Sequence, residues 1–140
     1  MALEAPTGMN IGVWIDHKRA VIAVPGRAEV VTVQSDLGTH ARHVGGGGGY
    51  PGSDSAQTGG SERREEERHR HALAQYYDEV IGRLGHPASL LILGPGEAKL
   101  ELKARLPHTM ANPQPVVALE SADHLTDPQI VARVTAHFTA

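Results

Sequence analysis

The chain has 140 residues, no cysteine and a formal net charge of −3 with histidine neutral. This length fits one domain with a single moderate core, and the absence of cysteine excludes disulfides, zinc–thiolate sites and thiol catalysis. The weak negative charge gives no global field for nucleic acid, so any RNA contact needs a local basic stripe.

No apolar run approaches the roughly 20 residues of a membrane span. The first residues have neither the basic start nor the apolar core of a secretion signal. We therefore expect a cytoplasmic protein without a membrane partner. Residues 1–9 are predicted to form a short flexible tail, and residues 10–140 a single domain.

The first third of that domain has the pattern of three antiparallel strands. Apolar runs or loose alternation at 10–15, 20–24 and 29–34 predict the strands. The polar link Asp16-His17-Lys18-Arg19 suits a hairpin between the first two, and Pro25-Gly26 a turn before the third.

Residues 45–60 change character. They hold half of the chain's sixteen glycines and no aliphatic side chain larger than Ala56. Such a segment buries too little apolar surface to offset the entropy of ordering, so we predict a mobile glycine-rich loop. A loop of this length inside a domain is usually functional or a linker.

A long helix is predicted over 61–84, with Ser61 as its N-cap. Its second half places Leu73, Tyr77, Val80, Ile81 and Leu84 at helical spacing, which predicts packing on a sheet. Residues 62–71 contain no apolar side chain. We expect this half to project into solvent, supported by the pairs Arg63/Glu67 and Glu66/Arg70.

The remaining elements alternate between strand and helix. Residues 90–93 predict a buried strand, followed by a Gly94-Pro95-Gly96 turn and a helix over 97–106 that ends at Pro107. Either the turn approaches a ligand closely, or its glycines serve backbone geometry alone. Residues 115–119 predict another buried strand. Thr126 and Gln129 form a capping-box pattern before a final helix that packs Ile130, Val134 and Phe138.

The predicted order is β-β-β-α-β-α-β-α, an α/β fold with a mixed sheet of three antiparallel strands and two parallel ones. Ribonuclease-H-like domains share this order. Their metal-dependent nucleases need converging carboxylates, for which Asp16, Glu97 and Asp123 or Asp127 are candidates. The same acids also suit a hairpin, a helix N-terminus and a cap, and topology alone is weak support for a nuclease.

The histidines form no convincing metal site. His40 and His43 have ligand-like spacing without an evident third ligand, and His69 and His71 face different sides of the predicted helix. No metal or other cofactor is expected. No nucleophile motif is present, and no catalytic residue is assigned.

One face of the long helix carries Arg64, Arg68, His71 and Gln75 at helical spacing. Guanidinium groups at this spacing can donate paired hydrogen bonds to phosphate oxygens. The interleaved glutamates suit an ordinary solvated face, and the residues by themselves leave both interpretations open.

Taken together, the glycine-rich loop, the Arg/Glu/His helix and the Leu-Ile-Leu-Gly-Pro-Gly-Glu-Ala-Lys block ending at Lys99 resemble a known family. This succession resembles the middle domain of archaeal and eukaryotic class-one release factors and of Pelota. It resembles most of all their small bacterial relatives, the translational-machinery-like proteins. The resemblance covers about residues 10–138 and implies a ribosome-associated protein.

The chain departs from the family at the loop tip. Release factors carry Gly-Gly-Gln there, which promotes hydrolysis of peptidyl-tRNA. Here Gly48-Gly49 is followed by Tyr50, and Gln57 precedes Gly59-Gly60 in the wrong order. The resemblance therefore implies a Pelota-like protein that binds without hydrolysis. It also implies that another protein could supply the decoding and GTPase-contacting domains that are missing from this chain.

We expect a translation accessory factor, of the release, rescue or hibernation kind, that binds the ribosome, rRNA or tRNA. The expected RNA contacts lie in the loop and on the helix: Gly46, Gly47, Gly48, Gly49, Tyr50, Arg63, Arg64, Arg68 and Arg70. Two alternatives stay open. One is a hydrolase, acting as a peptidyl-tRNA esterase or a metal-dependent nuclease, and the other is a protein-interaction module.

Overall fold

The computed structural model describes residues 9–35, 58–109 and 114–139. The predicted tail, apart from Met9, and the glycine-rich loop up to residue 57 lie outside this range. Within it, the elements follow in the order β1 (Asn10–Ile15), β2 (Arg19–Ala23), β3 (Val30–Gln34), α3 (Thr58–Leu84), β4 (Ser89–Gly94), α4 (Ala98–Thr109), β5 (Val116–Ser121) and α5 (Asp127–Thr139). The fold is α/β.

The described strands form one open, mixed sheet in the order β3-β2-β1-β4-β5. β1 pairs antiparallel with β2 and parallel with β4, and β4 pairs parallel with β5. The prediction of three antiparallel strands followed by two parallel ones is therefore confirmed. Because β1, β4 and β5 run in the same direction, their last residues meet at one edge of the sheet, which we call the carboxyl edge.

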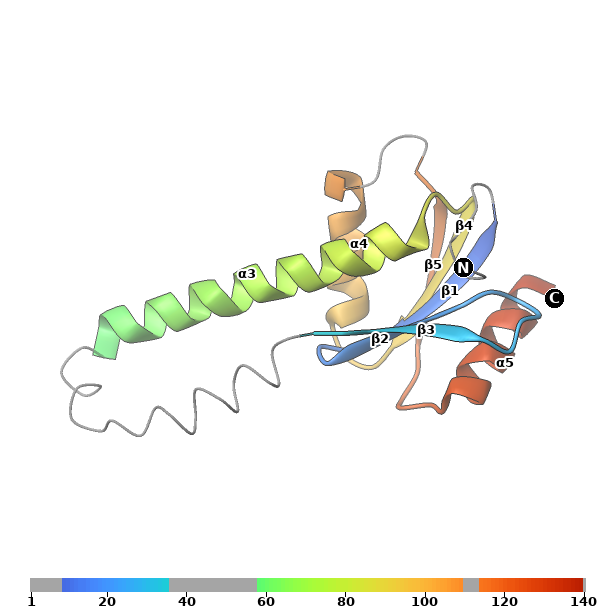
Figure 1. Cartoon of the computed structure of the whole chain (residues 1–140), viewed down its shortest axis with the longest axis horizontal. Coiled ribbons are helices and arrows are strands. Elements are labelled where there is room, and N and C mark those ends of the chain that lie inside the picture. The colour runs from blue at the N-terminus through green and yellow to red at the C-terminus, as the bar shows by residue number, and fades with distance from the viewer. Residues whose placement is uncertain (1–8, 36–57, 110–113, 140) are drawn as a thin grey trace.

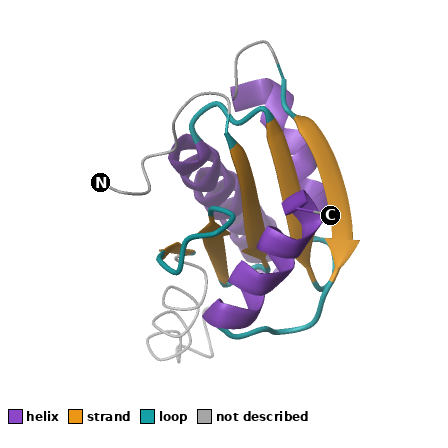
Figure 2. Ribbon diagram, turned by 90° about the vertical axis from the view of Figure 1, so that its right-hand side faces the viewer, coloured by secondary structure: helices purple, strands orange, loops and turns teal. Residues whose placement is uncertain are grey.

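Helices cover both faces of the sheet (Figure 2). On one face, Ile11, Val13 and Ile92 pack in a cluster with the apolar side chains of α3 and α4. On the other face, Trp14 and Leu91 pack with α5. Alternate residues of the central strands therefore enter two separate cores, and this explains why the apolar run in β4 is unbroken.

The carboxyl-terminal half of α3 lies on the sheet as predicted. Tyr77, Val80, Ile81 and Leu84 are buried, and Leu73 packs at the margin of the same cluster. Arg105 of α4 donates two hydrogen bonds to the Asp78 carboxylate of α3, at 2.8 and 3.0 Å. This forked pair joins the two helices on their half-exposed side.

Two predicted helix boundaries are wrong. α3 begins at Thr58, so Ser61 lies inside the helix and is not its N-cap. α4 continues through Pro107 to Thr109. Proline lacks the amide that would bond one turn back, and its ring crowds the carbonyl there, but only two residues of α4 follow Pro107, so little of the helix is disturbed.

The start of α5 agrees with the sequence pattern. The Gln129 side chain accepts a hydrogen bond from the Thr126 amide at 2.8 Å, and the Gln129 amide donates to the Thr126 hydroxyl at 3.3 Å. This reciprocal capping box satisfies two amides that would otherwise have no partner. Ile130 and Val134 are buried, and Phe138 is partly buried against the same cluster.

Gly94 ends β4 because no other residue fits there. Its φ is +151°, and a Cβ at this position would lie 2.2 Å from the carbonyl oxygen of Ile15. The close approach predicted for this turn is thus made to the neighbouring strand of the same chain. Gly96 has a φ of +65° and open space around it, which fits a turn residue.

Replacing Gly94 by alanine is expected to lower the free energy of unfolding by about 2 kcal/mol or more, because the added methyl overlaps a backbone oxygen and its φ is strained. Urea denaturation measures this change.

Gly82→Ala is the matched control. Gly82 lies inside α3, and its added Cβ would meet no atom within 4 Å. The same substitution should there raise stability by about 0.5–1 kcal/mol, since glycine is a poor helix former. Equal effects of the two substitutions would show that the close contact at Gly94 has no energetic weight.

Candidate functional site

Residues 63–71 of α3 form a stalk that projects beyond the sheet (Figure 1). Every side chain of the stalk is exposed. The reason lies in the sequence, because this half of the helix has no apolar side chain that could gain free energy by packing on the body. The expectation that this half of the helix projects is confirmed.

The predicted ion pairs within the stalk do not form. Neither Arg63–Glu67 nor Glu66–Arg70 approaches within 4.0 Å, and the only pair inside α3 among the described residues is Arg83–Glu79 at 3.6 Å. In the described part of the chain, the four stalk arginines have no carboxylate partner at ion-pair distance. Their guanidinium groups are therefore available to an external anion.

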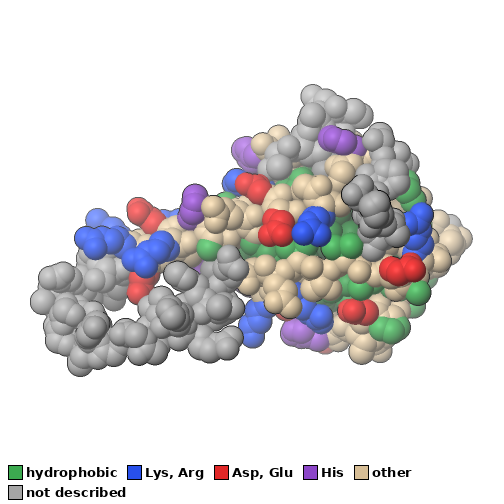
Figure 3. Space-filling view, in the orientation of Figure 1, with side chains coloured by type: hydrophobic (Ala, Val, Ile, Leu, Met, Phe, Trp, Pro, Cys, Tyr) green, Lys and Arg blue, Asp and Glu red, His purple; other side chains and the backbone are tan. Residues whose placement is uncertain are grey.

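Helix geometry divides these arginines into two pairs. Arg64 precedes Leu73 by about two and a half turns, so the two residues lie on opposite sides of α3. Arg68 lies about one turn from Arg64 and is rotated by about 40° from it, toward the side of the helix that carries Tyr76. Arg63 and Arg70 are about two turns apart and share a flank of the helix. Figure 3 shows Lys and Arg side chains gathered along the stalk.

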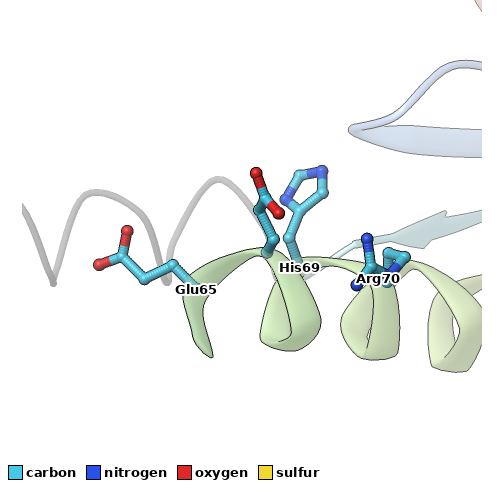
Figure 4. A pocket seen from close by; sticks show the side chains of 4 residues that line it. Glu65, His69 and Arg70 are labelled. Atoms are coloured by element: carbon cyan, nitrogen blue, oxygen red, sulfur yellow. The ribbon is translucent and has the colours of Figure 1, made fainter. Parts of the chain in front are cut away.

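A shallow hollow beside the stalk is lined by Glu65, Glu66, His69 and Arg70 (Figure 4). All four come from one side of α3, and two of them are carboxylates. They do not converge as metal ligands, because the described residues contain no group of three His, Cys, Asp or Glu that could hold a metal. With two carboxylates against one guanidinium, the hollow does not suit phosphate either.

The loop residues that were expected to contact RNA, Gly46 to Gly49 and Tyr50, lie outside the described residues. His40 and His43 do as well. His69 and His71 are described, and both are exposed on the stalk.

At the carboxyl edge, Asp16 fixes the turn between β1 and β2. Its carboxylate accepts hydrogen bonds from the amides of Lys18 and Arg19, both at 2.8 Å. The second carboxylate oxygen lies 3.3 Å from Nε2 of His124, which follows β5. Only 16% of the Asp16 side chain is exposed. These contacts show that the Asp16 carboxylate has a structural role in the turn.

Among the described residues, the carboxylates considered for nuclease chemistry do not form a group of three that could hold a metal ion. Asp123 contributes its backbone carbonyl, which accepts a hydrogen bond from Trp14 Nε1 at 2.9 Å. Glu97 contributes its carbonyl to the amides of Leu100 and Glu101 at the start of α4. Asp127 lies in the first turn of α5. Of the alternative roles that the sequence had left open, the carboxylate of Asp16 has the hairpin role, whereas the cap of α5 is formed by Thr126 and Gln129.

Two tyrosines, of which only Tyr77 was singled out from sequence, hold α3 where it leaves the body. The Tyr76 hydroxyl donates to the backbone carbonyl of Asp16 at 2.9 Å, and the Tyr77 hydroxyl donates to the Glu101 carboxylate. Burial, together with the nearby Asp16 charge, raises the pKa of Tyr76 above its ordinary value of 10.0. Burial and the hydrogen bond to Glu101 raise the pKa of Tyr77 in the same direction.

The grouping of basic residues around Trp14 was not expected from the sequence. The Arg19 guanidinium lies 5.2 Å from the centroid of the Trp14 ring, and the His124 ring lies 5.4 Å from it. Consecutive basic residues directly after a strand that ends at the carboxyl edge were the available signal, since ligands of α/β sheets bind outside this edge.

Comparison with protein-family models, with curated proteins and with solved structures finds no match of any of the three kinds. The relationship to release factors stays a prediction from the residues. Over the described residues, no helix has both the length and the hydropathy to cross a membrane.

Asp16→Ala is expected to lower the free energy of unfolding by about 1–2 kcal/mol, because it removes the acceptor of two turn amides. Asp16→Asn retains an oxygen acceptor and should cost less than half as much. Urea unfolding with and without Mg²⁺ measures both changes. An equal loss in the two variants, or a wild-type stability that depends on Mg²⁺, would contradict a structural role for this carboxylate.

The two tyrosines make stability depend on alkaline pH. In the unfolded chain their hydroxyls ionise near pH 10.0, whereas the folded chain keeps them protonated. The unfolded state then binds fewer protons, so the free energy of unfolding falls as pH rises above about 10. Denaturation at a series of pH values should show a steeper fall for the wild type than for the Tyr76→Phe/Tyr77→Phe variant. Parallel curves would refute the assignment.

Proposed function

We propose that this protein is a cytoplasmic translation accessory factor that binds the ribosome or tRNA, of the release, rescue or hibernation kind. The stalk and the predicted glycine-rich loop, of which residues 58–60 belong to α3, make the RNA contacts. The observation that carries this proposal is the stalk itself. It holds four exposed arginines, and in the described chain none of them has a carboxylate at ion-pair distance.

Within the described chain, no contact of the stalk side chains with the body accounts for this composition. The stalk buries no apolar surface, and the described chain gives it no ion pair. Arginine binds phosphate through forked hydrogen bonds, and Arg64 and Arg68 lie about one helical turn apart. The interleaved glutamates keep the net charge of the stalk low. This limits non-specific attraction to nucleic acid and favours a structured target with phosphates at fixed positions.

The proposed fold is ribonuclease-H-like. The described elements support it, because their order along the chain is β-β-β-α-β-α-β-α. The predicted glycine-rich loop precedes α3, so that the stalk would carry it at its tip. Such a loop has few side chains and suits entry into a narrow RNA channel. Since Gly-Gly-Gln is absent from the loop, the proposed factor does not hydrolyse peptidyl-tRNA, and a protein partner supplies the decoding and GTPase-contacting domains of a release factor.

The test is sedimentation of the purified protein with bacterial ribosomes through sucrose gradients at about 50 and 200 mM salt. We expect the wild type to move with ribosomes at low salt and to dissociate as salt rises, because phosphate contacts release counterions. Arg64→Gln/Arg68→Gln should reduce the ribosome-bound fraction several-fold at low salt.

Arg83→Gln is the matched control. Arg83 belongs to the same helix and carries the same charge, but it lies at the end remote from the stalk and makes only a surface ion pair. This variant should sediment like the wild type. A wild type that stays at the top of the gradient in low salt would refute the proposal, as would a double variant that binds as well as the wild type.

A further inference from the structure

The turn between β1 and β2 carries three basic side chains in succession, His17, Lys18 and Arg19, which we call the basic turn. Hydrogen bonds hold its backbone from several sides. The Asp16 carboxylate accepts from two of its amides, and the Asp16 amide donates to the Arg19 carbonyl at 3.0 Å. Ser35 donates to the carbonyls of Lys18 and His17, at 2.9 and 2.8 Å. The basic turn is therefore rigid before any ligand arrives.

Of the three side chains of the basic turn, only that of Lys18 has no partner among the described residues. Lys18 is exposed, and in the described chain no carboxylate lies within ion-pair distance of it. The Arg19 guanidinium lies over the Trp14 ring, and none of the described ion pairs includes it. Only His17 has an acidic partner, Glu101 at 3.1 Å. The Asp16 carboxylate is held by the turn amides and His124, so it does not neutralise Lys18 through a direct ion pair.

The basic turn lies beside the base of the stalk. Tyr76 of α3 contacts the Asp16 carbonyl directly. The end of the stalk nearer the body, His71, lies about one and a half helical turns before this contact. Arg68 precedes Tyr76 by about 12 Å along the helix axis and about 80° around it. Figure 3 shows Lys, Arg and His side chains together on the body near the point where the helix projects.

The aromatic side chains around this region do not reach solvent. Trp14 is 0% exposed, and Tyr76 and Tyr77 are 3% and 4% exposed. Proteins that bind single-stranded RNA stack its bases on accessible aromatic rings. Within the described residues, this end of the molecule offers exposed cations on a hydrogen-bonded turn but no accessible ring. That combination suits a ligand whose phosphates are already held in place.

We propose that the basic turn is a second phosphate-binding site and that it and Arg68 together hold a double-helical RNA segment across the base of the stalk. That the ligand is RNA rests on the proposed function. The choice of a duplex rests on the two cationic sites, which lie on separate elements, and on the buried state of the nearby rings. A stiff polyanion can reach both sites and loses little entropy on binding. Double-stranded RNA is also recognised mainly through its shape and phosphates.

The experiment is a fluorescence-anisotropy titration with two labelled RNAs of equal length, a hairpin of about 16 base pairs and an unstructured oligouridine. The wild type should bind the hairpin more tightly. Lys18→Gln should weaken hairpin binding about fivefold and reduce the slope of log K against log salt by about 1. Lys18 bonds to the turn through its backbone, which glutamine retains, and circular dichroism verifies the fold.

Arg83→Gln should match the wild type on both RNAs. If Lys18→Gln binds the hairpin like the wild type, the second site is refuted, while ribosome binding through the stalk stands. If oligouridine binds as tightly as the hairpin, the duplex preference is refuted. A wild type that binds neither RNA and does not sediment with ribosomes refutes the proposed function as well.

Discussion

The packing of the carboxyl-terminal half of α3 on the sheet is the constraint on which the rest of the structure depends. One sheet face needs apolar cover, and α3 supplies it from Tyr76 to Leu84 together with α4. The helix continues well beyond this cover, where it has no apolar side chain to bury. One half of α3 thus supports the sheet, and the other half exposes the stalk arginines to solvent. The two halves meet at the carboxyl edge.

The polar groups at that edge serve the architecture first. Asp16 fixes a turn, the carbonyl of Asp123 receives the Trp14 indole, and the carbonyl of Glu97 accepts the first amides of α4. None of the described buried side chains has an unsatisfied polar atom. Of these acids, only Asp16 has its carboxylate bound to the scaffold, whereas Glu97 and Asp123 are exposed. Lys18 and the four stalk arginines have no acidic partner at ion-pair distance in the described chain.

Much of the fold follows from the sequence because its strongest signals are local. Buried strands such as β4 have unbroken apolar runs, and the capping box at Thr126 marks the start of α5. The start of α3 was missed because glycine and serine favour caps and turns, yet Thr58 to Ser61 are helical. The end of α4 was missed because proline near a helix end costs little. The site was harder to predict: ion-pair formation in the stalk depends on side-chain geometry, and the grouping of Arg19, His124 and Trp14 depends on strand order, since Trp14 and His124 are far apart in sequence.

The tyrosine contacts at the base of the stalk also act as a fulcrum. From Tyr76 to Arg63 the helix forms a lever arm of about 20 Å, so a tilt of about 10° at the fulcrum displaces the far end by about 3 Å. That displacement equals the length of a hydrogen bond. The positions of the stalk arginines therefore depend on how firmly the hydrogen bonds of Tyr76 and Tyr77 hold α3 to the body, at a distance from the arginines themselves.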